Sequence, residues 1–416
     1  MSLGEKAMKY KLWLLLLVFL VGCASFERQL ADDLVKSASH QLNRCEIAGF
    51  RYAGMDAELQ RPKLLKVLMI HGVGTHHPGY SRLLQEKLAN QINLQVRSRQ
   101  PKNILLRDPA SPQTPLGNLQ ITYWQSEDGR RKMLFYELTW SVITTPYKQI
   151  LAFDTTEQYS EFRVPFNNVM KEFLDNALPD PMIYLKDPKN LIVNSSKQAM
   201  CWMLQTDWNN IPDNQAGVCS VSTAEEAKAL SEQNVMFVTH SLGSQILMDT
   251  IVDFADRVSD SNQQATALQN KELTLFMMAN QLPILLIDRP LPRVHNQFDS
   301  YCRRAGKAYN KRIFKGINIV AFSDPNDILS YAIPQTFADK YIDSRLCPLV
   351  TNVSVNVAPE ISALGFGIVN PVEAHTFYDR SPKVINLMTH GTDNFYEDSA
   401  LDGQCHFIHL KNDKAM

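Results

Sequence analysis

This sequence of 416 residues has no excess of positive or negative charge. Its 42 Lys and Arg residues are balanced by 43 Asp and Glu residues, for a formal net charge of −1. Binding to nucleic acid needs a basic face, so we exclude nucleic acid as a partner. Glycine and proline stay at ordinary levels, 17 and 21 residues, which excludes collagen-like and low-complexity chains. With 45% apolar and 20% charged residues, the chain is expected to fold around an apolar core.

A long hydrophobic run is missing as well. The apolar run over residues 12–21 has about ten residues, which is too short to cross a bilayer as a stable helix. It follows Lys9 and Lys11 and matches the apolar core of a signal peptide over residues 1–22. The run ends in Leu-Val-Gly-Cys23, which resembles the lipobox of bacterial lipoproteins. The resemblance implies cleavage before Cys23 and lipidation of that residue; an ordinary cleaved signal with an incidental cysteine is the alternative.

The residues after Cys23 are predicted to join a lipid anchor to a folded domain. Ala24 stands where lipoproteins held in the inner membrane typically carry Asp, so the resemblance favours the outer membrane, facing the periplasm. Two or more acyl chains make such anchoring stable. Residues 23–62 form the anchor-proximal segment, with a helix predicted over 25–44 from an apolar stripe.

Zinc-type C-x-x-C spacing is also missing, and we expect neither a metal site nor a cofactor. An even number of cysteines in an oxidising compartment indicates disulfides, although six cysteines allow 15 connectivities. Cys201 and Cys219 are the first pair we predict, because both fall in one predicted insertion. Several buried free thiols are the alternative. The six cysteines that follow Cys23 are Cys45, Cys201, Cys219, Cys302, Cys347 and Cys405.

Residues 63–416 show the alternation of strands and helices that predicts an α/β domain with a doubly wound, mostly parallel sheet. Short apolar runs predict buried strands, and apolar stripes predict helices over 80–92 and 241–258. An irregular stretch over about 142–223 is interpreted as a cap or lid insertion, and 405–410 as an edge strand. The predicted strands are 64–70, 121–124, 133–140, 235–238, 273–278, 317–322 and 350–355.

One motif joins a predicted buried strand to an amphipathic helix. The run Val-Thr239-His-Ser241-Leu242-Gly243 resembles the nucleophile elbow G-x-S-x-G of the α/β-hydrolases, whose strand–turn–helix context it shares. The resemblance implies that Ser241 is the nucleophile, exposed at a helix N-terminus where negative charge is favoured. Thr239 replaces the first glycine of the motif. A buried serine that caps a core helix is the alternative.

A second motif, His71-Gly72-Val73-Gly74, directly follows the strand predicted over 64–70. It resembles the His-Gly loop that supplies half of the oxyanion hole in these hydrolases. The backbone N–H groups of Val73 and Leu242 are then expected to bind the oxyanion. The adjacent pair His76 and His77 is better interpreted as a polar loop rim than as metal ligands, because no carboxylate or Cys pattern completes a site.

The remaining two members of a catalytic triad are expected late in the chain, in the order Ser, acid, His. Asp327 follows the strand predicted over 317–322 by a few residues and precedes an apolar pair, whereas Asp324 precedes a proline and is favoured as a turn residue. His375 is predicted to lie in the loop before the last helix and is favoured as the base. His390 falls in the last turn of that helix, where a cation suits the helix dipole.

Together the motifs predict a membrane-anchored serine hydrolase of the lipase or esterase kind, with the triad Ser241, Asp327 and His375 and a small-molecule or lipid ester as substrate. An acyltransferase that uses the same acyl-enzyme is one alternative. A lipoprotein that keeps the fold without catalysis, as a binding or envelope-interaction module, is another.

Overall fold

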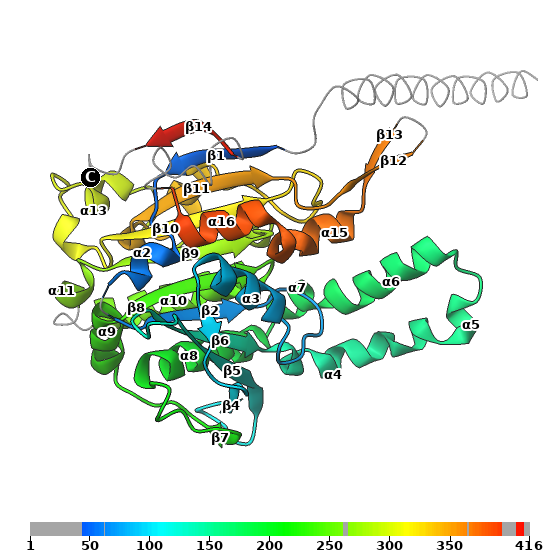
Figure 1. Cartoon of the computed structure of the whole chain (residues 1–416), viewed down its shortest axis with the longest axis horizontal. Coiled ribbons are helices and arrows are strands. Elements are labelled where there is room, and N and C mark those ends of the chain that lie inside the picture. The colour runs from blue at the N-terminus through cyan, green and yellow to red at the C-terminus, as the bar shows by residue number, and fades with distance from the viewer. Residues whose placement is uncertain (1–43, 62, 261–264, 364–365, 393–404, 412–416) are drawn as a thin grey trace, which may run out of the picture.

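A computed structural model describes residues 44–61, 63–260, 265–363, 366–392 and 405–411 (Figure 1). The predicted signal peptide, Cys23 and all but the last residue of the helix predicted over 25–44 lie outside the described residues. Within the described part, the chain forms an α/β structure around one mixed sheet of 12 strands and a separate two-stranded hairpin.

Six neighbouring strands at the centre of the large sheet are parallel. This block confirms the prediction of a mostly parallel sheet. In spatial order they are β11 (Pro348–Val355), β10 (Gly316–Ser323), β9 (Glu272–Met278), β8 (Asn234–His240), β2 (Leu65–Ile70) and β6 (Lys132–Thr139).

Further strands extend this block on both sides. Next to β6 lie β5 (Pro115–Gln125), β4 (Lys102–Arg107) and β7 (Gln215–Gly217), with β3 (Gln95–Val96) paired to β5. Next to β11 lie β1 (Cys45–Phe50) and then β14 (His406–Lys411) at the edge of the sheet. These strands join the block through antiparallel pairs, β5 with β6 and β1 with β11, whereas β7 pairs with β4 and β14 with β1 in parallel. The edge strand predicted over 405–410 is therefore confirmed, whereas β1, β3, β4 and β7 were not predicted.

Helices cover both faces of the sheet, because its central strands are apolar on both sides. Alternate residues of β2, such as Leu68 and Met69, belong to two different buried clusters. One cluster packs against α2 (Met55–Leu59), α3 (Arg82–Gln91) and α16 (Pro382–His390), and the other against α8 (Lys189–Gln205), α9 (Thr223–Glu232) and α10 (Gly243–Ser259). The two apolar clusters, one on each face of the sheet, hold the parallel strands in place. The candidate site lies at the carboxyl ends of these strands.

The stretch 142–223, predicted as one insertion, has two structurally different halves. The first half projects from the body of the molecule (Figure 1), and we call residues 141–184 the arm. In the second half, α8 packs on the sheet and β7 pairs with β4. The arm consists of η1 (Ser141–Ile143), α4 (Thr145–Lys148), η2 (Gln149–Thr155), α5 (Glu157–Ser160), α6 (Pro165–Ala177) and α7 (Pro179–Tyr184).

Shorter elements complete the described chain. Between β9 and β11 lie α12 (Leu282–Leu285), α13 (Phe298–Cys302), η3 (Tyr309–Lys311), α14 (Gln335–Tyr341) and η4 (Ser344–Leu346), and α11 (Ala265–Leu268) precedes β9. The hairpin β12 (Glu360–Ala363) and β13 (Phe366–Val369) leads into α15 (Pro371–Thr376) and η5 (Phe377–Arg380).

Three disulfides join the six described cysteines. Cys201 pairs with Cys219, as predicted, and this bond fastens α8 to the chain that follows β7. Cys302 pairs with Cys347, and Cys45 pairs with Cys405 across 360 residues, which ties β1 to the start of β14. In the portion of the chain described here, no helix is long and apolar enough to cross a membrane.

Candidate active site

Ser241 occupies the sharp turn between β8 and α10, at the carboxyl end of the parallel strands. Its φ of +55° lies in the left-handed region, which costs a non-glycine residue about 1–2 kcal/mol. The Ser241 N–H donates to the carbonyl of Met278 at the end of the neighbouring strand, over 2.9 Å. A strained backbone that the surrounding strands hold in place is typical of functional turns.

Two glycines permit the close approach of this turn to the end of β2. A Cβ on Gly243 would lie 2.4 Å from the carbonyl oxygen of Ile70, and one on Gly72 would lie 2.5 Å from Cβ of Ser241. Thr239, which replaces the first glycine of the elbow motif, is fully buried and its hydroxyl lies 3.2 Å from that of Ser244. Thr239 is therefore packed in the core at the end of β8, with its hydroxyl in a polar contact to the first turn of α10.

Ser241, His375 and Asp327 come together as a hydrogen-bonded chain. The Nε2 atom of His375 lies 3.1 Å from Oγ of Ser241, and its Nδ1 atom lies 2.9 Å from both carboxylate oxygens of Asp327. Because Nδ1 faces a carboxylate, it carries the proton, and Nε2 is left to accept from the Ser241 hydroxyl. All three side chains are buried.

The carboxylate of Asp327 is held in its ionised form. Burial alone would raise the pKa of Asp327, but the hydrogen bond and the charge of His375 bring the pKa below its ordinary value, aided by the N–H of Leu329. The Tyr378 hydroxyl donates to Oδ2 of Asp327 over 3.2 Å and accepts the N–H of Asp324.

Asp324, the competing candidate for the acid, has a different function. Its carboxylate accepts the N–H groups of Asn326 and Val357, over 2.8 and 2.7 Å. It therefore closes the turn after β10 and ties that turn to the chain after β11. The structure places Asp327, and not Asp324, against His375.

His375 lies in the last turn of the short helix α15 rather than in a loop, which corrects the predicted local structure. His240, directly before the elbow serine, donates from Nε2 to the backbone carbonyl of His375 over 2.8 Å. Desolvation, with His375 nearby, lowers the pKa of His240 to about 3, so this ring stays neutral. His390 ends α16, and its ring lies against the Thr389 hydroxyl.

The N–H groups of Val73 and Leu242 are the two proposed oxyanion donors, and among the described residues neither has an acceptor. His71 fixes the peptide that carries the first donor. The N–H of Trp140 donates to Nε2 of His71, so the proton sits on Nδ1 and binds the carbonyl of Gly72. In a trans peptide the N–H points away from the carbonyl, so the His71 ring sets the direction of the Val73 N–H.

The His71 ring is a structural group and not a base. It is buried and stacks on the Trp140 ring with 4.7 Å between centroids. Desolvation, with His76 nearby, lowers the pKa of His71 well below its usual value. His76 in turn donates from Nε2 to the carbonyl of Val73. In the described portion of the chain, no three His, Cys, Asp or Glu side chains are grouped so that they could hold a metal ion.

The triad is closed to solvent in this structure. Ser241 has no exposed surface and His375 only 2%, so a substrate needs neighbouring segments to move apart. A cavity of about 980 Å³, with a charged lining that includes Lys271 and Glu272, lies at the amino ends of the strands, opposite the triad. Its position excludes it as the pocket that serves Ser241.

Sequence reasoning missed His240, Tyr378 and Asp180, a buried arm residue that contacts the His-Gly loop. Tyr378 lies one helical turn after His375, and His240 adjoins the nucleophile, so local spacing could have suggested both. Nothing in the sequence near Asp180 points to Gly74, which is 106 residues away.

In comparisons with family models, curated proteins and solved structures, nothing matches this chain.

Proposed function

We propose that this protein is a serine hydrolase with the α/β-hydrolase fold that cleaves an ester through an acyl-enzyme. The observation that carries the proposal is the hydrogen-bonded chain from Ser241 through His375 to Asp327. The left-handed turn at Ser241 and the order of the triad along the chain support it further. The parallel sheet, with the turn at the carboxyl end of β8, is compatible with that fold.

In the first half of the proposed reaction, the Ser241 oxygen attacks the ester carbonyl carbon while Nε2 of His375 takes the hydroxyl proton. The carbonyl oxygen becomes an oxyanion and accepts from the N–H groups of Val73 and Leu242. Collapse of the tetrahedral intermediate breaks the bond to the alcohol, which receives the proton from His375. Asp327 keeps the ring oriented and stabilises its charged form.

In the second half, water replaces the alcohol. His375 takes a proton from the water as its oxygen attacks the acyl carbon, and the same two N–H groups hold the second oxyanion. Collapse releases the acid and returns the proton to Ser241. Each half needs a neutral Nε2 at its start, which the Nδ1–H···Asp327 bond provides.

We further propose that the protein is held at the outer membrane, on its periplasmic side, by a lipid anchor on Cys23. The lipobox-like run before Cys23 supports this location, and the three disulfides suit an oxidising compartment. Mass spectrometry of the mature N-terminus tests it. An unmodified residue other than Cys23 at that end would contradict the anchor.

A fluorophosphonate probe tests the nucleophile on the purified full chain in mild detergent. Wild type is expected to be labelled on Ser241 and to release acid from p-nitrophenyl esters or phospholipids, and Ser241→Ala is expected to do neither. Ser244→Ala is a matched control in the first turn of α10 and should still be labelled. A Ser241→Ala protein that folds correctly and turns over like wild type would overturn the mechanism.

A further inference from the structure

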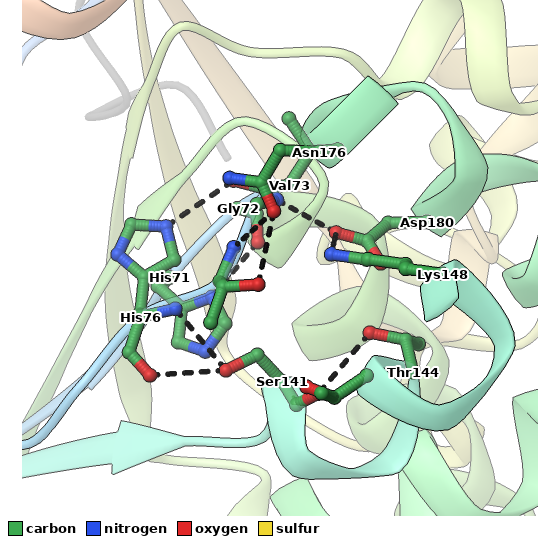
Figure 2. A network of polar contacts seen from close by, with 12 residues as sticks. His71, Gly72, Val73, His76, Ser141, Thr144, Lys148, Asn176 and Asp180 are labelled. Carbon is green, nitrogen blue, oxygen red and sulfur yellow. Dashed lines mark hydrogen bonds and ion pairs between the residues drawn. The ribbon is translucent and has the colours of Figure 1, made fainter. Parts of the chain in front are cut away.

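The arm contacts the His-Gly loop through one buried carboxylate. Oδ2 of Asp180, in α7, accepts the N–H of Gly74 over 2.6 Å and the ammonium of Lys148, in α4, over 2.8 Å. Figure 2 shows this group across the loop from His71. We propose that Asp180 is a positioning residue for the oxyanion hole, which rests on the proposed function of the site.

The two peptide groups on either side of the Cα atom of Val73 are each held by hydrogen bonds. The preceding peptide is held from the sheet side, because the Gly72 carbonyl binds the His71 ring. The following peptide is held at both ends: its carbonyl accepts from the His76 ring and its N–H donates to Asp180. Rotation at Val73 therefore requires breaking a bond to the sheet side or a bond to the arm.

Gly74 has a φ of +100°, and because glycine has no Cβ to restrict its backbone, contacts from outside the loop are needed to hold this conformation. The next residue is held from the arm too. The N–H and hydroxyl of Thr75 both donate to Oδ1 of Asn176, in α6, over 3.1 and 2.9 Å. Two arm helices, α6 and α7, thus hydrogen-bond to the loop that carries the Val73 N–H, and Lys148 of α4 supports the contact through Asp180.

The carboxylate is a strong and rigid acceptor at this position. Asp180 has no exposed surface, and the side chain of Lys148 is only 8% exposed. A charged acceptor makes a hydrogen bond about twice as strong as a neutral one, and Lys148 compensates its charge. The consequence is that the arm, although it projects from the body, belongs to the machinery that orients an oxyanion donor.

Two double variants separate the loss of the acceptor for the Gly74 N–H from the loss of the ion pair between Asp180 and Lys148. Asp180→Asn with Lys148→Met keeps an oxygen for the Gly74 N–H, and Asp180→Leu with Lys148→Met removes that oxygen at similar size. Neither leaves an unpaired buried charge. Loss of a full oxyanion donor lowers kcat by about 10²–10³, so we expect the Leu variant to have a kcat about 10–100-fold below the Asn variant, with KM changed less than about threefold.

Hydrogen exchange of the peptide covering residues 72–79 gives a readout that does not need activity. The Gly74 amide should exchange at least about tenfold faster in the Leu variant than in the Asn variant. The control is Lys171→Met: Lys171 pairs with Asp154 and Asp175 inside the arm and not with the loop. It should leave both kcat and exchange at wild-type values.

The outcomes separate this inference from the proposed function. Equal kcat and equal exchange in the two double variants, with an active wild type, would overturn the role of Asp180 alone. A wild type that hydrolyses no ester and is not labelled on Ser241 would overturn both. A purely structural role would show as equal losses of melting temperature with unchanged kcat in the folded fraction, and it would also overturn the inference.

Discussion

Ser241 and Asp327 follow strands of the central sheet and His375, in α15, hydrogen-bonds to both, whereas the loop that carries Val73 lies between that sheet and the arm. The sheet side is held by buried apolar side chains, such as Phe135 in β6, which has no exposed surface. The arm leaves large apolar side chains in solvent: Ile150 is 76% exposed and Phe162 91%. The two regions therefore position their parts of the site by different means.

Polar contacts hold the arm where the apolar core does not reach. Asp154 pairs with Arg163 inside it, and Lys148 and Asp180 fasten its base to the loop. Elements with few buried apolar contacts open locally at lower free energy than core strands. Ser241 and Asp327 thus lie at the ends of strands in the apolar core, whereas the loop with the Val73 N–H depends partly on an arm that polar contacts hold.

The largest expected effect is a loss of kcat when a member of the proposed triad is removed. His375→Ala removes the general base, and we expect kcat to fall by about 10⁴-fold or more, as for other triad members. His390→Ala, at the end of α16 and away from Ser241, should keep kcat near the wild-type value and cost mainly stability. Steady-state kinetics on both purified variants check this. A normal kcat for His375→Ala with an inactive His390→Ala would reverse the assignment.

A pair of phenylalanines tests the contrast in stability. Phe135→Ala leaves a cavity in the sheet core and should lower the free energy of unfolding by about 3–5 kcal/mol. Phe162→Ala, on the exposed arm, should change it by less than about 0.5 kcal/mol. Urea unfolding followed by circular dichroism measures both. Similar losses for the two variants would show that the arm contributes to the cooperative core.

Acid should lower the free energy of unfolding through His240, which lies at the end of β8 in the central sheet. Its pKa falls from an unfolded value of 6.5 to about 3 in the fold, so below pH 6.5 the unfolded chain takes up a proton that the folded one does not. The free energy of unfolding should then decrease as the pH falls from 6.5 toward 3, by at most about 1.4 kcal/mol per pH unit for this group.

Urea titrations at several pH values measure that slope, and His240→Asn provides the comparison. The asparagine cannot be protonated, so the slope of the variant should be smaller than that of wild type. His71, also buried and neutral, keeps its own contribution in both proteins. Identical slopes would show that the His240 ring takes up a proton in the folded protein.

The smallest expected effect concerns helix ends. Ser222 caps α9 on the sheet with a reciprocal capping box to Glu225, whereas α4, α5, α6 and α7 of the arm have no side-chain cap. Ser222→Ala should cost about 1 kcal/mol, and Thr156→Ala, before α5, close to none. Thermal unfolding of the two variants decides whether capping distinguishes the regions.

The strands of the parallel block could be predicted because they are short runs of mostly apolar residues, although β11 alternates with polar residues at Asn352 and Ser354. The same signal failed for β1 and β4, in which several positions are partly exposed. The partners of β1 also lie far away in the sequence. In the stretch 142–223, both α6 and α8 carry apolar residues at helical spacing, so periodicity does not separate the arm from α8. Only packing on the sheet, through residues such as Met203, distinguishes the two halves.

The sequence by itself determined the local parts of the site: a buried strand, a small-residue turn and an amphipathic helix around Ser241, and glycines at 72 and 243 where backbones must approach. The strand, the turn and the helix depend on neighbours a few residues away, whereas the two glycines can be read from their motifs although their close contacts form only in the fold. Only the tertiary structure decided that Asp327 and not Asp324 reaches His375, that His240 holds His375, and that Asp180 holds Gly74. Each is a contact across 48 to 135 residues, and such contacts exist only once the sheet and its covering helices have placed the partners within hydrogen-bond distance.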